Sequence, residues 1–433
     1  MLTAFYQAFR TPDLRKKLLF TLFIIVIFRL GASLPTPGVS EHAVHFCVKG
    51  ATKTGVLGLV NLLSGGALLR LTVFALGIMP YITASIILQL LAVVIPRLEA
   101  LRQEGAAGTA KITQYTRYLT IGLAILQSTA IVALAESGNL LPGCTQNLIP
   151  NRSVFTISTM VICMTAGTAV IMWLGELITD RGVGNGMSLM IFTQVIAVIP
   201  GQLYQILGTE GAFIFLLVLA VGVLIVAAVA FMEQAQRRIP VQYAKRMVGR
   251  KMYGGTSTYI PLKVNQAGVI PVIFASSLLY IPALAANLFG KQTATSGWTV
   301  WVQTHLIRGD DPYYMLGFFV LIILFTYFYV SITFNPDEVA ENMRKAGGFI
   351  PGIRPGGPTA GYLRFVLNRL TAPGSLYLGI VALIPMLAIS LVHAGNQFPL
   401  GGTSIMIAVG VGLDTVKQIE SQLQQRNYEG FLR

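Results

Sequence analysis

Stretches of apolar residues alternate with shorter polar stretches along the whole chain. A helix that crosses a membrane needs about 20 predominantly apolar residues. Backbone groups in lipid must find their hydrogen bonds within the segment, so each stretch is expected to be helical. We predict ten transmembrane helices, of which the fifth is short, over residues 18–33, 71–95, 116–135, 154–175, 187–203, 212–232, 267–289, 313–333, 375–392 and 403–421.

Composition supports a membrane protein and excludes a soluble one. Hydrophobic residues make up 54% of the 433 residues and charged residues only 11%. A soluble domain carries about 25% charged residues, so this chain would lack the charge to cover a water-facing surface. The predicted class is an all-α polytopic membrane protein.

The basic residues show which side of the membrane each loop occupies. Of the 31 lysines and arginines, 24 lie on the side of the two termini and 5 on the opposite side. Cytosolic loops carry an excess of lysine and arginine, so both termini are expected in the cytosol. The two longest cytosolic loops, 233–266 and 334–374, are basic and contain several glycines and prolines. They either fix topology only or form a docking face, because loops of this length are commonly functional.

A short repeat predicts two related halves. Residues 77–85 (GIMPYITAS) and 268–276 (GVIPVIFAS) share the pattern Gly-x-x-Pro-x-Ile-x-Ala-Ser, five spans apart. An odd number of spans gives the halves opposite orientations, which is a transporter plan with its working site at the midplane. We divide the chain into a first half, residues 1–203, and a second half, residues 204–433. The Gly and Pro are expected to weaken and bend each helix near its start.

One apolar segment on the outer side is too short to span. Residues 56–70 read VLGLVNLLSGGALLR and precede the second span without a polar linker. An interfacial helix is one interpretation. A re-entrant plug facing the protein interior is the other, because backbone at membrane depth must be buried in protein when it is not a spanning helix.

No enzyme chemistry is evident. The chain has no nucleotide-binding or hydrolase motif, and the spans hold a single deep carboxylate, Asp414. His42 and His45 are interpreted as ordinary loop residues rather than metal ligands. Cys47 and Cys144 both lie in outer loops, where free thiols are the default and a disulfide is the alternative. We therefore expect no cofactor, no metal and no catalytic residue.

Two function classes fit these features. An ion-coupled transporter of small solutes would suit the repeat but would be expected to show more charge within the spans. A protein-conducting channel suits an interior of isoleucine, small residues and amides, because an isoleucine-lined constriction sheds water and resists ions. An intramembrane enzyme lacks any nucleophile–base pair that we can place.

Long motifs along nearly the whole chain resemble the bacterial SecY family, the channel subunits of the Sec protein translocon. The motifs are TVFALGIMPYITASIILQLL (72–91), KITQYTRY (111–118), WLGELITDRGVGNGMSL (173–189), QRRIPVQYAKR (236–246), PLKVNQAGVIPVIFASS (261–277), NPDEVAENMRKAGGFIPGIRPG (335–356) and GGTS (401–404). The resemblance implies two inverted five-helix halves shaped like an hourglass. It also implies a plug helix at about 57–70.

The resemblance further implies a pore ring and a lateral gate. The ring consists of Ile78, Ile82, Met187, Ile191, Ile273 and Ile407. Met187 departs from the isoleucine usual in the family, which predicts a looser seal because methionine is flexible. The gate lies where the second and third spans meet the seventh and eighth. Its polar positions are Thr83, Gln127 and Asn265, although three unrelated interhelical hydrogen bonds would look the same.

Docking and partners also follow from the resemblance. The residues expected to dock the SecA motor ATPase or the ribosome are Arg237, Arg238, Lys245, Arg246, Arg250, Lys251 and Arg354. The other expected partners are the SecE and SecG subunits, polypeptides with a signal sequence, ribosomal RNA, anionic lipids and a second copy of the channel. The expected location is the bacterial cell membrane.

Overall fold

The computed structural model describes most of the chain. The described residues are 9–50, 65–136, 148–209, 211–243, 246–248, 251–253, 257–289, 301–302, 305–306, 311–392 and 402–429.

Within the described residues, a helix is present at each of the ten predicted spans. The helices are α2 (Pro12–Gly31), α5 (Met79–Val94), α7 (Ala106–Glu136), α8 (Val154–Arg181), α9 (Gly186–Thr209), α10 (Ala212–Gln234), α11 (Ile270–Phe289), α13 (Pro312–Thr333), α15 (Gly357–Val392) and α16 (Gly402–Glu429). Among these residues, five helices are long and apolar enough to cross a membrane by length and composition alone, or six if a bent pair at α5 counts as one span. The all-α membrane fold is confirmed.

Four predicted boundaries differ from the structure. The second and seventh spans begin as helix only at Met79 and Ile270, later than the apolar pattern suggested. The ninth helix begins at Gly357, well inside the predicted loop 334–374. The proposed division after residue 203 falls inside α9, which continues to Thr209.

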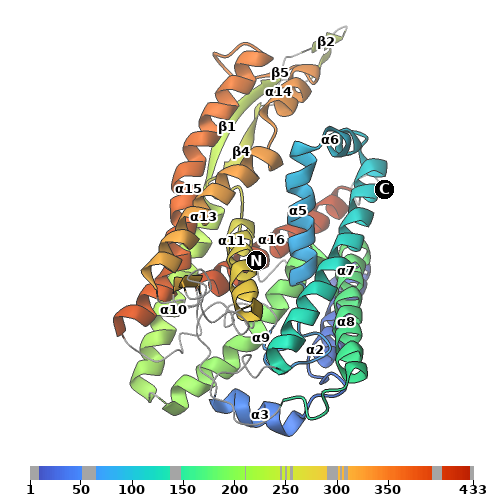
Figure 1. The fold of residues 1–433 in the computed structure, drawn as a ribbon. Coiled ribbons are helices and arrows are strands. Elements are labelled where there is room, and N and C mark those ends of the chain that lie inside the picture. The colour runs from blue at the N-terminus through green and yellow to red at the C-terminus, as the bar shows by residue number, and fades with distance from the viewer. Residues whose placement is uncertain are drawn as a thin grey trace.

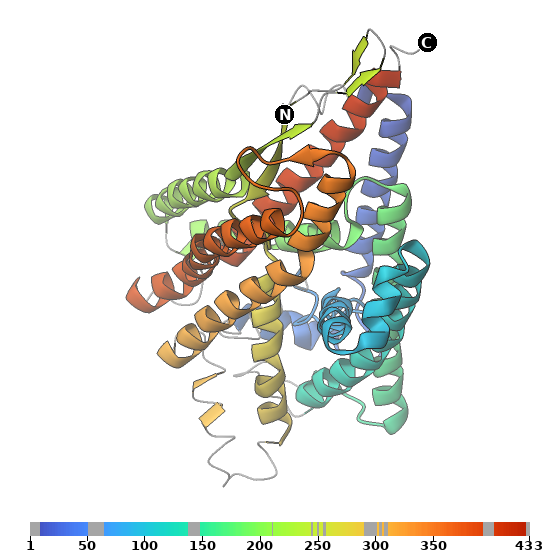
Figure 2. The same ribbon diagram turned by 90° about the horizontal axis from the view of Figure 1, so that it is seen from above.

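Helices of each half pack mainly against one another. In the first half, α8 packs on α2, α7 and α9, while α5 packs on α7; in the second half, α13 packs on α11 and α15, and α10 packs on α16. Seen from above, the two sets lie on opposite sides (Figure 2). They meet in more than one place. On one side α9 packs against α10 and α16, and on the other α11 packs against α5 and α7.

The two long basic loops are folded. Strands β1 (Gln236–Tyr243) and β4 (Ser257–Lys263) form an antiparallel hairpin, and β5 (Gly348–Phe349) pairs with the end of β1. The short strands β2 (Arg246–Val248) and β3 (Lys251–Tyr253) pair near the hairpin tip. Helix α14 (Pro336–Lys345) packs on α15. Buried Ile239, Leu262, Met343 and Val366 join these elements in one apolar cluster.

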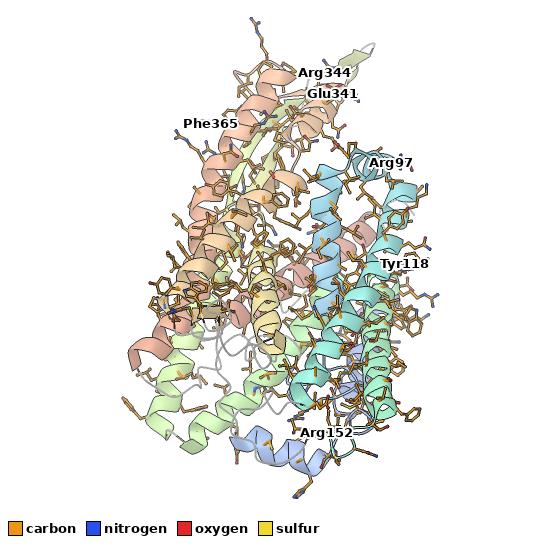
Figure 3. The ribbon with its side chains drawn as sticks, viewed as in Figure 1. Arg97, Tyr118, Arg152, Glu341, Arg344 and Phe365 are labelled. Atoms are coloured by element: carbon orange, nitrogen blue, oxygen red, sulfur yellow. The ribbon has the colours of Figure 1, made fainter. Side chains whose placement is uncertain are left out.

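The hairpin region therefore forms an extension with its own small core. Figure 1 shows it projecting beyond the bundle, with helix α6 (Pro96–Gln103) at the same end and α3 (Glu41–Gly50) at the opposite end. Figure 3 shows Arg97 on α6 and Arg344 on α14 at the extension's end, while Arg152 lies at the other. The sequence also predicted that the loops of Arg97 and Arg344 lie on one side of the membrane and the loop of Arg152 on the other.

Candidate functional site

The six predicted ring residues all lie in one apolar cluster between the halves. Ile78, Ile191, Ile273 and Ile407 are buried in this cluster, and Ile82 and Met187 pack against it partly exposed. They come from the start of α5, from α9, from α11 and from α16. Both halves thus contribute apolar side chains to the same cluster.

The repeated motif acts as a helix start and not as a bend. Gly77 and Gly268 both adopt left-handed backbone, with φ of 56° and 61°. A helix then begins two residues later, at Met79 in one copy and Ile270 in the other. Each proline is thus the second helical residue, where its missing N–H costs no intrahelical hydrogen bond. The predicted bend is wrong for this reason.

Met187 is held in the first turn of α9. Its backbone N–H donates to the side-chain oxygen of Asn185 at 3.0 Å. The thioether packs closely on α8, because a Cβ built on Gly175 would lie 2.6 Å from the sulfur atom. The family's usual isoleucine is branched at Cβ and reaches less far, so methionine here fills the space that Gly175 leaves.

Only the end of the predicted plug lies within the described residues. Residues 57–64 lie outside them, and residues 65–70 form turns and not a helix. Ala67, Leu68 and Leu69 are buried there. Gly65 has φ of 68°, and a Cβ on it would lie 3.2 Å from Nη1 of Arg29 and 3.3 Å from Cα of Gln194. This end of the segment therefore packs against α2 and α9.

Two polar groups beside Gly65 have no hydrogen-bond partner among the residues that the structure describes. Gln194 has no exposed surface, and neither its amide nitrogen nor its amide oxygen is paired. Nη1 of Arg29 is also buried and unpaired. Leaving such groups without hydrogen bonds is costly. Sequence reasoning missed Gln194, because an amide within an apolar span gives no sign of whether it is paired.

The three predicted gate residues occupy different surroundings. The Thr83 hydroxyl donates to the Met79 carbonyl of its own helix at 3.0 Å. Gln127 is half-buried on α7. The amide nitrogen of Asn265 donates to Oε1 of Glu233 at 2.5 Å and to the Gly268 carbonyl at 3.2 Å. These hydrogen bonds do not join the three residues to one another, although the helices α5, α7 and α11 do pack together.

Asn265 instead belongs to a polar cluster at the base of the hairpin. Glu233, at the end of α10, is 7% exposed, and Asn265 is 3% exposed. Beside them, Nζ of Lys263 lies 3.1 Å from Oδ1 of Asp414. The cluster links the end of β4 to α10 and α16 just before α11 begins. Glu233 lies at the end of a strongly apolar span, where a carboxylate normally reaches water, so the sequence did not indicate its burial.

Five of the seven predicted docking residues fall within the described residues, and these five lie on the extension. Arg237, Arg238 and Arg354 are exposed. The Arg238 guanidinium lies 4.8 Å from the centre of the Tyr259 ring. Arg246 and Lys251 lie in β2 and β3, near the hairpin tip. Lys245 and Arg250 fall outside the described residues.

Cysteine and metal predictions can be compared in part. Cys47 is disulfide-bonded and Cys163 is free, so the default of free thiols is wrong for Cys47. The remaining cysteine, Cys144, falls outside the described residues. Within the part of the chain that the structure describes, no group of three or more His, Cys, Asp or Glu side chains is placed to hold a metal ion.

Comparisons with known proteins agree with the resemblance seen in the sequence. The SecY family model matches residues 72–416. A relative from Streptomyces galbus, "Protein translocase subunit SecY", is 66% identical over 440 residues that cover 100% of both chains.

Two solved structures have the same fold. One is described as "The plug domain of the SecY protein stablizes the closed state of the translocation channel and maintains a membrane seal"; it has a TM-score of 0.62 and 18% identity, and the match covers 94% of this chain and 91% of the other. The second is Sec61 in the canine ribosome-channel complex from the endoplasmic reticulum, with a TM-score of 0.60, 17% identity and the same coverages, 94% and 91%.

Proposed function

The chain belongs to the SecY family, and from that premise we propose that it is the central channel subunit of the Sec translocon. It is a channel rather than an enzyme. It passes unfolded secretory polypeptides across the membrane and releases membrane-protein helices sideways into the lipid. One observation carries the proposal: six apolar side chains from four helices of both halves meet in one cluster. Such a ring resists water and ions without binding the polypeptide that passes through it.

The two halves are the moving parts. We place the flexible connection where α9 meets α10 and α16, and the lateral gate where α5 and α7 meet α11. Thr83, Gln127 and Asn265 remain the proposed polar positions of this gate. A signal helix gains about 0.3–0.6 kcal/mol per central Leu, Ile, Phe or Val in lipid, enough over ten such residues to compete with weak gate contacts.

Energy comes from partners that dock on the extension. The SecA motor and the ribosome are the proposed partners, and Arg354 and the exposed arginines of β1 are the proposed contacts. Arginine always carries its charge and can form paired hydrogen bonds with carboxylate or phosphate. The SecE and SecG subunits are further proposed partners, as are anionic lipids and a second copy of the channel. The proposed location is the bacterial cell membrane, with both termini in the cytosol.

Reconstitution tests the channel function directly. The complex with SecE and SecG is placed in vesicles with SecA, ATP and a signal-bearing polypeptide. The polypeptide should become protected from external protease, and a polypeptide without its signal should not. A complex that instead passes a small solute without any partner, and protects no polypeptide, would favour the secondary transporter.

Ion conductance of the same vesicles tests the seal. Wild type should be tight, and deletion of residues 57–70 should leak. Ile407→Ser should also leak, because it places a hydroxyl in the apolar ring, whereas Ile380→Ser on the exposed face of α15 should not. If wild type conducts, Met187→Ile should tighten it. If the deletion stays tight, the ring alone suffices and the plug is not needed.

A further inference from the structure

Within the described residues, a side-chain hydrogen bond joins the two halves at the cytosolic mouth of the proposed gate. Nη2 of Arg102, on α6, donates to the backbone carbonyl of Ile332, on α13, at 3.3 Å. Arg102 belongs to the first half and Ile332 to the second. Every other hydrogen bond and ion pair named above joins residues of the same half. This contact is therefore placed where a separation of the halves would break it.

The carbonyl that Arg102 meets is one that the helix leaves unpaired. Helix α13 ends at Thr333, so the Ile332 carbonyl is among the last four, which have no partner within the helix. These carbonyls carry the negative end of the helix dipole. A guanidinium satisfies both requirements, since it donates a hydrogen bond and places a positive charge there.

The position of Arg102 depends on a sharp change of direction. Helices α5 and α6 are bent by 105° at the break before Pro96. This turns α6 away from the axis of α5 and brings its last turn toward α13. Because α6 follows α5 directly and packs on both α5 and α7, a movement of these two helices away from α11 would carry Arg102 away from Ile332.

We propose that Arg102 is a latch that holds the cytosolic mouth of the gate closed. The latch rests on the proposed lateral gate between α5, α7 and α11. A signal helix that enters the gate would displace α5 and break this hydrogen bond. The contact is exposed and single, so it biases the closed state without locking it.

Arg97 provides a matched control on the same helix. It is exposed like Arg102 and makes no hydrogen bond or ion pair with the residues that the structure describes. Figure 3 shows it at the same end of the molecule as Arg344. Arg97→Gln and Arg102→Gln change the net charge equally. A difference between them therefore reports the contact and not the charge.

The direct test is a distance measurement across the mouth. Spin labels are attached to cysteines at Glu99 on α6 and Glu338 on α14, with Cys163→Ala to remove the free thiol. In the reconstituted complex, Arg102→Gln should raise the ratio of wide to narrow distances about 2- to 10-fold, the range expected from one net hydrogen bond. Arg97→Gln should leave the ratio unchanged, and Arg102→Lys should keep most of the narrow population. Equal distributions for the two glutamine variants would overturn the latch.

Export separates the latch from the channel function. With a cargo whose signal sequence is weakened, Arg102→Gln should raise export several-fold over wild type, because the gate opens more readily. With a full-strength signal, the two should export equally. If Arg102→Gln lowers export of both cargoes, Arg102 acts in docking and the latch is wrong. A wild type that exports neither cargo counts against the channel function itself, and the distance measurement still decides whether the contact holds the halves together.

Discussion

Two buried amides in this protein differ in how far they are paired. The amide nitrogen of Asn265 donates to a carboxylate and to a carbonyl and only its oxygen is unpaired, while neither polar atom of Gln194 has a partner among the described residues. Asn265 lies just before α11, and Gln194 lies beside the end of the proposed plug. A buried polar group costs free energy only when it lacks partners, so the two residues should respond oppositely to substitution.

Gln194→Leu should stabilise the protein. Leucine has a similar size and removes two unpaired polar atoms, so the free energy of unfolding should rise by about 1–3 kcal/mol. Thermal unfolding of the purified protein measures the change. Gln234→Leu, at an exposed end of α10, should change it by less than about 0.5 kcal/mol. A destabilised Gln194→Leu variant would mean that the amide is paired, for example with water.

The bond between Glu233 and Asn265 should be strongly coupled. A double-mutant cycle with Glu233→Ala and Asn265→Ala should give a coupling of about 1.5–3 kcal/mol, typical of a hydrogen bond to a charged group. Lys263 and Asp414 provide the control, because their side chains are 38% and 61% exposed. Their cycle should give less than about 1 kcal/mol. Similar values for the two cycles would contradict the difference in burial.

At the scale of elements, glycine and proline decide where helices begin and how closely they approach. The left-handed Gly77 and Gly268 each precede a helix that starts in the same register with proline in its first turn. Within helices, glycine allows close contact. A Cβ on Gly167 of α8 would lie 2.1 Å from the Val73 carbonyl, whereas one on Gly122 of α7 would meet open space.

Gly167→Ala and Gly122→Ala should therefore have opposite effects. The first forces α8 away from the segment before α5 and should cost about 1–3 kcal/mol. The second removes a flexible residue from a helix interior and should gain up to about 1 kcal/mol. Unfolding of both variants in the same detergent measures the difference. Equal changes in the free energy of unfolding would show that only the helix propensity of the residue matters. In that case α8 could move away from Val73 at no measurable cost.

At the scale of the whole molecule, the extension lies apart from the proposed pore ring. Its core of Ile239, Leu262, Met343 and Val366 is distinct from the apolar cluster that contains the predicted ring residues. The exposed arginines of the extension therefore lie away from that cluster, where the proposed partners would reach them. The hairpin joins the bundle at the hydrogen-bonded pair Glu233 and Asn265, just before α11 begins.

Arg354→Glu should abolish motor-driven export and leave the fold intact. Arg354 is exposed on a turn before α15, so reversing its charge should disturb a partner and not the interior. Export of a signal-bearing polypeptide should fall at least tenfold, with an unchanged unfolding temperature. Arg369→Glu gives the same charge change on a side chain that lies over the Phe365 ring, and it should export normally. Normal export by Arg354→Glu would refute its role.

The sequence by itself determined the number and type of spanning elements. Lipid offers no hydrogen bonds, so a long apolar run has one stable form, and the charges of its loops decide its direction. The repeated motif also indicated that Ile78 and Ile273 are related positions in the two halves, and both lie in one apolar cluster. These features depend on neighbouring residues along the chain.

Only the tertiary structure decided which side chains meet across the chain. The structure pairs Asn265 with Glu233 and Arg102 with Ile332, which are far apart in sequence. It also leaves the buried amide of Gln194 without a partner among the described residues. Contacts between distant segments also explain why a basic loop folds into a hairpin and why α15 begins at Gly357, before its predicted span. Their stability comes from packing between distant segments, and no local pattern of apolar and polar residues records which distant segment will be the partner.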